Sequence, residues 1–340
     1  MANSIEFAKR YTGILDEVYQ RSAVSGCLNS GSNMVRAGRN AKEILIPRVE
    51  VTGLGDYVRN QGYKTGSITW AYETHTFGYD RAIRLFADVM DVEEGGILDA
   101  FVAAGAELQR TQVAPEGDAY TFAQIAGTEG VTVESEDLSE ATASDILASL
   151  RTVTNAMDER QVSTGSRILF ITPTLRGVVD DFSMANPNRS NRVLERFSRI
   201  VEVPQVRFYS AIDLLNGDDD NFGYQKRTQT YKKTTDVALV DGKTYYTKSG
   251  DTYTPVAAAD LDVDDIGTYY EVAVAGGVDL NYMVVEKSAI IKYAKHVASR
   301  VFSPDELESL DSYMLKYRRY AIVSVLQNKL DGVYVSASTS

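Results

Sequence analysis

Residues 44–80 read ILIPRVEVTGLGDYVRNQGYKTGSITWAYETHTFGYD. Polar and apolar residues alternate over 48–51, and they alternate again over 68–76, where Trp70 and Tyr72 fall on the same side of the strand. Four glycines, which permit turns, lie between the two runs. The stretch therefore predicts two long strands joined by a glycine-rich tip. A lone ribbon of this length is only marginally stable in water, so we expect it to need a partner surface.

Residues 1–43 predict an N-terminal arm with little core of its own. They contain one short helical pattern, followed by Ser, Gly and Asn residues that are typical of loops. From Met1 to Arg48 there are seven Lys or Arg residues and four acidic residues, whereas the whole chain has a net charge of -12. An arm of one sign on a body of the other sign favours self-association. The overall negative charge argues against broad binding to nucleic acid.

A long helix is predicted after the ribbon, between Asp91 and Pro115. Asp91 can cap it, because Glu94 follows three residues later as in a capping box. Apolar residues then recur at helical spacing. Residues 115–117, Pro-Glu-Gly, are expected to interrupt the helix, and residues 118–126 resume a helical pattern.

A mixed α/β domain is predicted downstream. A second helix starts near Thr142, residues 167–171 form an apolar run typical of a buried strand, and Pro173 suits the first position of a further helix. The chain ends with more strands, which the alternation predicts over 313–326 and 333–335.

Residues 218–271 differ in composition from their surroundings and predict a small β insertion. They are polar, and two turn signals, Asp241-Gly242 and Ser249-Gly250, separate short alternating runs. An insertion of this kind is tolerated where a loop lies at the surface.

The chain offers few residues for catalysis. A single cysteine, Cys27, excludes a disulfide within the chain and is expected to pack as a small hydrophobe. His75 and His296 are the only histidines, so a nucleophile–histidine triad or a metal site of nitrogen and sulfur ligands is disfavoured. Phosphate-binding glycine motifs are absent from the sequence. We therefore expect no enzyme activity, no cofactor and no metal.

One acidic pattern has an alternative interpretation. Asp260, Asp262, Asp264 and Glu271 have the spacing of the ligands in an EF-hand calcium loop. The glycine that such a loop requires is replaced by Asp265, and the flanks predict strands. An acidic turn in solvent is the favoured interpretation, and a calcium site is the alternative.

A basic stripe is predicted on a helix. The stripe has spacing i, i+3, i+7 and i+10 and consists of Arg189, Arg192, Arg196 and Arg199. It can be a solvated face that pairs with Glu195 and Glu202, or it can contact an acidic neighbour.

The ordered set of elements resembles the major capsid protein of tailed bacteriophages, whose shell fold is shared with encapsulins. The resemblance covers nearly the whole chain except residues 218–271. It is carried by five stretches: VAPEGDAYTFAQIA at 113–126, GSRILFITP at 165–173, VPQVRF at 203–208, YRRY at 317–320 and NKLDGVY at 328–334.

The resemblance implies an α+β fold with named parts. They are an N-terminal arm (1–43), an extended β-hairpin loop (44–80), a peripheral domain with a long spine helix (81–127), an α/β axial domain with the β insertion (128–287), and a return to the peripheral domain (288–340).

The resemblance also implies a function. Copies of the chain would assemble as hexamers and pentamers into the icosahedral head of a tailed phage, which encloses packaged double-stranded DNA without sequence-specific binding. The extended loop would lie over the next subunit, so Trp70 and Tyr72 join the four arginines as candidate subunit contacts. Some relatives cross-link a loop lysine to an asparagine; Lys64 and Asn328 match these positions loosely, so we expect no cross-link.

Partners and location follow from the same resemblance. The arm is too short for a fused scaffold, so we expect a separate scaffolding protein, together with a portal. Residues 1–6 lack the basic start and apolar core of a secretory signal, and no apolar run is long enough to span a membrane. We therefore expect synthesis in the cytoplasm of a bacterial host, residence in the virion capsid and no membrane contact.

Two other classes of protein remain as alternatives. An encapsulin-type nanocompartment shares the fold but holds cargo enzymes. A soluble acidic enzyme or a surface-layer module is the second alternative. The lack of a catalytic constellation argues against the enzyme, and the lack of a signal argues against the exported layer.

Overall fold

A computed structural model gives the structure of the chain. It describes residues 23–30, 36–37, 43–57, 59, 62–90, 105–185, 191–236, 240, 243–257, 260–262, 266–306 and 312–339. The predicted helix cap at Asp91 and Glu94 and the turn at Asp241-Gly242 lie outside these residues.

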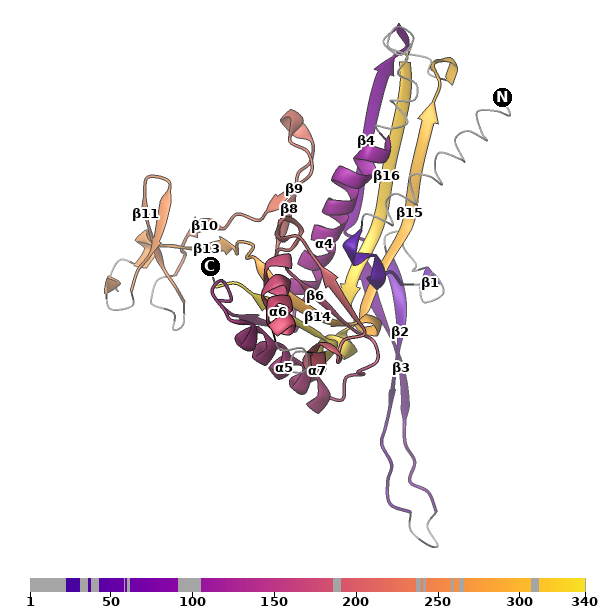
Figure 1. Ribbon diagram of the computed structural model, residues 1–340, viewed down its shortest axis with the longest axis vertical. Helices are drawn as coiled ribbons and strands as arrows, with labels where there is room; N and C mark the ends of the chain where they lie inside the picture. Colours follow the sequence, from indigo (N-terminus) through magenta and orange to yellow (C-terminus); the bar gives the residue numbers. More distant parts are fainter. Residues whose placement is uncertain are drawn as a thin grey trace.

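A long, narrow sheet forms one end of the molecule (Figure 1). It has the order β15-β16-β4, with β4 at Tyr79–Asp88, β15 at Ile290–Phe302 and β16 at Ser312–Val325. All pairs are antiparallel. Residues of β4 alternate between half-buried and exposed, as expected for strands with one covered face.

A helix covers one face of this sheet. Residues 105–108 are helical, a wider π-helical turn spans Gln109–Val113, and helix α4 continues over Ala114–Ala126. The ring of Tyr120 packs on Tyr79 of β4 with 4.8 Å between centroids. The prediction that residues 115–117 interrupt the helix was wrong. Pro115 is tolerated because it lies in the first turn of α4, after the π-helical turn that rearranges the hydrogen bonds there.

The predicted ribbon is confirmed as a pair of antiparallel strands. Strand β2 spans Glu43–Val51 and β3 spans Ile68–Thr76, in a register that pairs Glu43 with Thr76 and Val51 with Ile68. A short strand, β1 at Arg36–Ala37, adds to β2. The ribbon extends from the body in the direction opposite to the long sheet (Figure 1).

A five-stranded sheet forms the second core. Its order is β5-β17-β14-β6-β7, with bounds Thr132–Ser135, Val333–Ala337, Leu280–Glu286, Arg167–Ile171 and Arg199–Glu202. Helices α5 (Ala143–Glu159), α6 (Pro173–Ala185) and α7 (Asn191–Leu194) accompany it. As predicted, Thr142 caps α5, here in a reciprocal capping box with Asp145. Of the helices in the described ranges, none has the length and apolar content needed to cross a bilayer.

The last strand joins this second sheet. β17 pairs with β14 and β5, not with β15 or β16, although a turn at Gln327–Gly332 connects it directly to β16. The C-terminal segment, residues 288–340, is therefore shared between the two sheets. The chain crosses from one core to the other at that turn.

Two smaller elements project from the body. Strands β8 (Ile212–Leu214) and β9 (Tyr224–Lys226) form a hairpin. A separate four-stranded sheet, β10-β13-β11-β12, occupies the predicted insertion and has bounds Thr230–Lys233, Tyr270–Val274, Tyr246–Ser249 and Thr252–Pro255. The hairpin turn predicted at Ser249-Gly250 joins β11 and β12.

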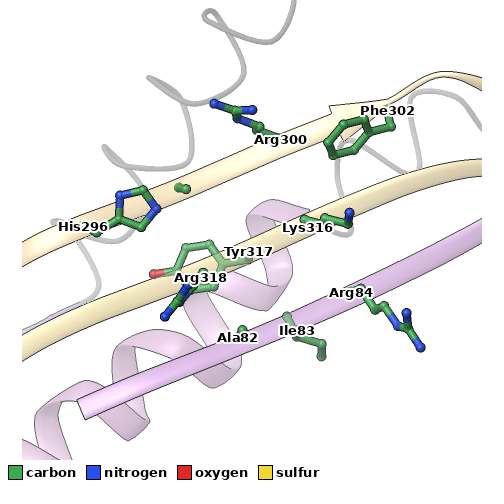
Figure 2. A pocket seen from close by; sticks show the side chains of 10 residues that line it. Ala82, Ile83, Arg84, His296, Arg300, Phe302, Lys316, Tyr317 and Arg318 are labelled. Atoms are coloured by element: carbon green, nitrogen blue, oxygen red, sulfur yellow. The ribbon is translucent and has the colours of Figure 1, made fainter. Parts of the chain in front are cut away.

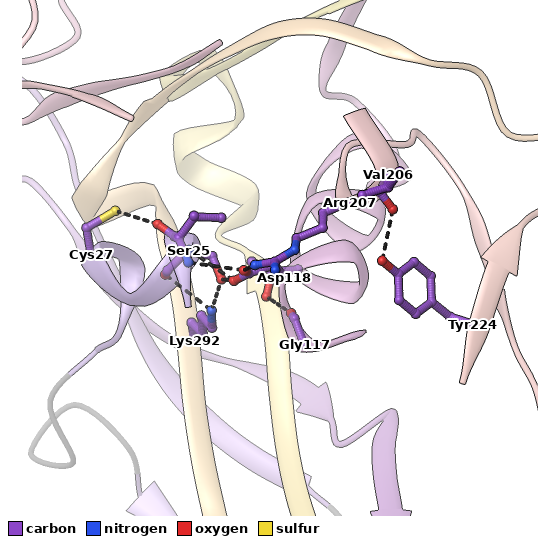
Figure 3. A network of polar contacts seen from close by, with 10 residues as sticks. Ser25, Cys27, Gly117, Asp118, Val206, Arg207, Tyr224 and Lys292 are labelled. Carbon is purple, nitrogen blue, oxygen red and sulfur yellow. Dashed lines mark hydrogen bonds and ion pairs between the residues drawn. The ribbon is translucent and has the colours of Figure 1, made fainter. Parts of the chain in front are cut away.

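A buried carboxylate holds Val24 and Ser25, in the middle of the N-terminal arm (Figure 3). Asp118 of α4 is fully buried and accepts hydrogen bonds from the backbone N–H groups of Val24 and Ser25, both at 3.0 Å, and from the Ser25 hydroxyl. Arg207 donates to the same carboxylate at 3.2 Å. The expectation that the whole arm lacks a core is corrected here, because residues 24–28 form a 3₁₀ helix, η1, that docks on α4.

Lys292 of β15 completes this network. Its ammonium donates to the hydroxyl and the carbonyl of Ser25, and the side chain is buried. Burial lowers the pKa of Lys292 to about 8, although the charge of Asp118 acts in the opposite direction. Such a network is fully satisfied only when all of its segments are in place, so the arm, the helix and β15 are coupled. Cys27, half-buried beside it, packs as expected, and burial raises the pKa of its thiol.

Stability is expected to rise with pH because of Lys292. Its ordinary pKa of 10.5 applies to the unfolded chain and the folded value is about 8, so between these values the unfolded chain binds more protons. The free energy of unfolding should therefore increase from pH 8 to 10.5, by at most about 3 kcal/mol. Urea titrations of the chain and of Lys292→Met check this. Tyrosines also titrate in this pH range, and both proteins contain the same ones. If the free energy of unfolding rises by the same amount in Lys292→Met as in the wild type, the assignment to Lys292 is contradicted.

Candidate assembly surfaces

The ribbon has one apolar face that is exposed to solvent. Cross-strand pairing places Trp70 opposite Val49 and Ile68 opposite Val51. Trp70 is 67% exposed and Ile68 is 63% exposed. The apolar ribbon face consists of Pro47, Val49, Val51, Ile68, Trp70 and Tyr72.

The opposite face of the ribbon is polar. Arg48 and Glu50 form an ion pair there, and Thr69 lies across from Glu50. Side chains alternate between the two faces of a strand, so this separation follows from the sequence pattern and the observed register. The ribbon is therefore amphipathic without a core of its own to cover its apolar face.

The tip is exposed as well. Leu54 is fully exposed, and Tyr63, which packs edge-on against Tyr57, is 91% exposed. Soluble monomers rarely expose contiguous apolar surface of this kind, and larger patches mark interaction sites. Trp70 and Tyr72, which the sequence selected, thus lie together on a surface suited to bind another protein.

The base of the ribbon is anchored to the body. The hydroxyl of Ser324 on β16 and Nδ1 of His75 are 2.8 Å apart, and Nε2 of His75 is 3.1 Å from Glu73. Phe77 stacks on Tyr320 with 4.7 Å between ring centroids. His75 is only 9% exposed, and its contact with Ser324 and the stacking of Phe77 on Tyr320 hold the base of the ribbon against β16. Burial lowers the pKa of His75, and Glu73 partly offsets the effect.

The predicted basic stripe does not continue as one helix from Arg192 to Arg199. Helix α7 ends at Leu194, and Arg199 lies on strand β7, so helical spacing does not bring these arginines onto one face. Arg192 is exposed, and Arg196 donates to Asn155 of α5 at 2.7 Å. The helical prediction was wrong because the chain turns after Leu194 to add β7 to the sheet.

The three arginines that the structure describes, Arg192, Arg196 and Arg199, do not share one helix face. Arg189 lies outside the described residues. Arg196 makes contacts within its own chain, with Thr154 and Asn155 of α5. The ribbon aromatics lie on a different part of the molecule, so the sequence-selected residues do not converge.

Glu271, the last member of the acidic pattern near 260–271, pairs with lysines. The carboxylate of Glu271 forms ion pairs with Lys232, at 2.9 Å, and with Lys243. These lysines lower the pKa of Glu271. Asp264 and Asp265 lie outside the described residues. In the part of the chain that the structure describes, no group of three or more His, Cys, Asp or Glu side chains could hold a metal ion.

Comparisons with known proteins agree on the fold. No protein-family model and no curated protein matches the chain. A chain in the capsid structure of cyanophage P-SCSP1u is 13% identical and has a TM-score of 0.54, over 92% of this chain and 87% of that one. A virus-like particle from Pyrococcus furiosus is 8% identical with a TM-score of 0.52, over 97% of this chain and 99% of that one.

These likenesses establish the architecture. The chain has the α+β fold of tailed-phage capsid subunits, which the virus-like particle shares. The fold predicted from the five sequence stretches is thereby confirmed.

Acidification is expected to loosen the base of the ribbon. The docked ring of His75 has a lowered pKa, whereas an undocked ring binds a proton at the ordinary value of 6.5. Docking is therefore fully favourable above pH 6.5 and weakens as the pH falls below that value. Amide hydrogen exchange of residues 73–77, corrected for intrinsic rates, should rise on acidification in the wild type and stay level in His75→Gln. An identical acid response in both proteins contradicts the role of His75.

Proposed function

We propose that the chain is the major capsid protein of a tailed phage. Copies assemble as hexamers and pentamers into an icosahedral head that encloses packaged double-stranded DNA. The observation that carries this proposal is the apolar ribbon face, which projects from the body and is not covered by any segment of the chain that the structure describes. The likeness in fold to a phage capsid subunit supports the same role.

The ribbon lies over the neighbouring subunit in this proposal. Burying a large side chain such as that of Trp70 or Tyr72 stabilises a contact by about 1.5–3 kcal/mol per side chain. Trp and Tyr are also enriched among the residues that dominate interface energies. The anchored base then determines the direction of the ribbon, and the exposed face makes the contact.

We assign the parts of the fold accordingly. The long sheet and the helix that covers it, within 81–127 and 288–340, form the peripheral domain. The five-stranded sheet and its helices form the axial domain, within 128–287 except for β17, which the C-terminal segment contributes, and the four-stranded insertion belongs to it. The arm and the ribbon, at 1–43 and 44–80, connect subunits.

Other partners complete the proposal. A separate scaffolding protein and a portal take part in assembly, and DNA is enclosed without sequence-specific contacts. The acidic chain suits this role, because DNA has to slide inside the shell during packaging. The chain is made in the host cytoplasm, resides in the virion and performs no catalysis. Lys64 and Asn328 are both exposed, but we propose that mature subunits are not cross-linked.

A cargo-holding nanocompartment is the second candidate. It is favoured by the likeness to the virus-like particle, which spans 99% of that chain. The contents of the particle distinguish the two candidates: packaged double-stranded DNA indicates a phage head, and a co-purified enzyme indicates a compartment.

Electron microscopy of the purified chain tests the proposal directly. The chain, alone or with a scaffolding protein from the same genome, should form closed icosahedral particles, and denaturing gels should show single subunits. Small oligomers under every assembly condition refute the shell function. Covalent ladders refute only the absence of cross-links.

Removal of the ribbon aromatics should weaken assembly. Trp70→Ala with Tyr72→Ala removes two large side chains from the apolar ribbon face, and the concentration needed for assembly should rise by about tenfold or more. Thr69→Ala on the polar face serves as the control and should have little effect. Light scattering against subunit concentration gives the measurement, and thermal unfolding verifies that each variant folds. Equal assembly of the double variant and the control contradicts the proposed contact.

A further inference from the structure

The long sheet has a second face that α4 does not cover. Strand register places Arg84 of β4 opposite Lys316 of β16, and Lys316 opposite Arg300 of β15. All three side chains are exposed on the face that points away from α4 (Figure 2). We call these three residues the basic band.

The basic band is unfavourable in an isolated subunit. Like charges directly opposite one another on neighbouring strands destabilise a sheet. Within the described ranges, the three cations form no ion pair with a carboxylate. Lys316 instead lies over the ring of Phe302, 4.8 Å from its centroid. In the adjacent row Arg318 does pair with a carboxylate, that of Asp80 at 2.7 Å.

The basic band borders a hollow of about 590 Å³. Its lining is largely apolar and includes Ala82, Ala298 and Phe302 beside the cations. A partner that fits this surface therefore combines negative charge with an apolar side chain.

One loop of the same chain has that chemistry. The connection between β8 and β9 carries Asp218, Asp219 and Asp220, all exposed, followed by Phe222, which is 60% exposed. Asp219 and Asp220 have φ values of 52° and 61°, a backbone conformation that is costly for residues other than glycine. We call Asp218–Phe222 the acidic loop. The three adjacent carboxylates repel one another, so the acidic loop, like the basic band, is unfavourable in an isolated subunit.

The two surfaces cannot meet within one copy. The guanidinium of Arg81, on the α4 side of β4, donates to the carbonyls of Leu215 and Gly223 at 2.6 and 3.1 Å. The hairpin that carries the acidic loop therefore stands on the α4 side of the sheet. The basic band lies on the opposite side, because residues 81 and 84 of one strand point to different faces.

We propose that the acidic loop of one copy docks on the basic band of a second copy, with Phe222 in the hollow. The inference rests on the proposed shell function. It specifies which surface of one subunit meets which surface of the next. Two different patches meet, so the contact is head-to-tail and closes into rings when the rotation allows it. Charge complementarity of three acids and three bases fixes the register and disfavours other pairings.

DNA is a less suitable occupant. Strands are about 4.8 Å apart, so the basic band spans only about 10 Å and offers few phosphate contacts. The hollow beside it is apolar, whereas a DNA backbone is charged throughout. The net charge of -12 also repels a polyanion.

Charge reversal and charge exchange test the contact. In the full chain, Lys316→Glu or Asp218→Lys should each raise the concentration needed for half-maximal assembly by about tenfold. In the exchange variant, which carries both changes, this concentration should return to within about threefold of the wild-type value, because an acid at position 316 can again pair with a base at position 218. Lys248→Glu and Asp251→Lys are matched controls at exposed positions of the insertion and should assemble normally.

The outcomes separate this inference from the shell function. If wild-type chain forms no particles, either alone or with a scaffolding protein from the same genome, the proposed function fails. If it forms particles and Lys316→Glu assembles at the same concentration, or the exchange variant is not rescued, the inference fails alone. Normal assembly of Lys316→Glu with a loss of retained DNA assigns the basic band to phosphates and also overturns the inference. Thermal unfolding of each variant shows whether a loss of assembly comes from misfolding.

Discussion

The antiparallel register of β16 with its two neighbours is the constraint on which the structure depends. β16 is the central strand of the long sheet, so a shift of one residue would move its buried side chains to the opposite face. Leu315 and Tyr317 would then leave the core, and Lys316 would enter it. The same strand supplies Ser324 to the ribbon base and continues through a turn into the second sheet. One register thus positions the sheet, the ribbon and the connection between the two cores.

The local elements were predictable because their signals are local. Alternation of side chains predicted the ribbon, and a capping residue predicted the start of α5. The two aromatic residues of the ribbon could also be selected, since a strand with aromatic residues on one side and no neighbouring core has to expose them. The predicted fold was right as an ordered set of such elements.

The features that were missed depend on distant parts of the chain. Pro115 is accommodated in α4 because a π-helical turn precedes the helix, and no pattern in the sequence predicts that turn. The buried network that links Asp118 to Lys292 through Ser25 joins segments that are far apart in sequence. The basic band takes one residue from each of three strands, so only the register brings Arg84, Arg300 and Lys316 together. The arginine stripe failed for the converse reason, since regular spacing was read as a helix where the chain enters a strand.

The four-stranded insertion is connected to the body through two neighbouring strands and has a small core of its own. Its entry strand β10 and exit strand β13 pair with each other, from Thr230 opposite Val274 to Lys233 opposite Tyr270. The two ends of the insertion therefore lie side by side, and its small core around Tyr245 and Tyr269 is its own. A segment connected through adjacent ends can be exchanged without strain on the rest of the fold. Evolution is thus free to replace this module, and an engineer could graft a foreign domain at the same stem.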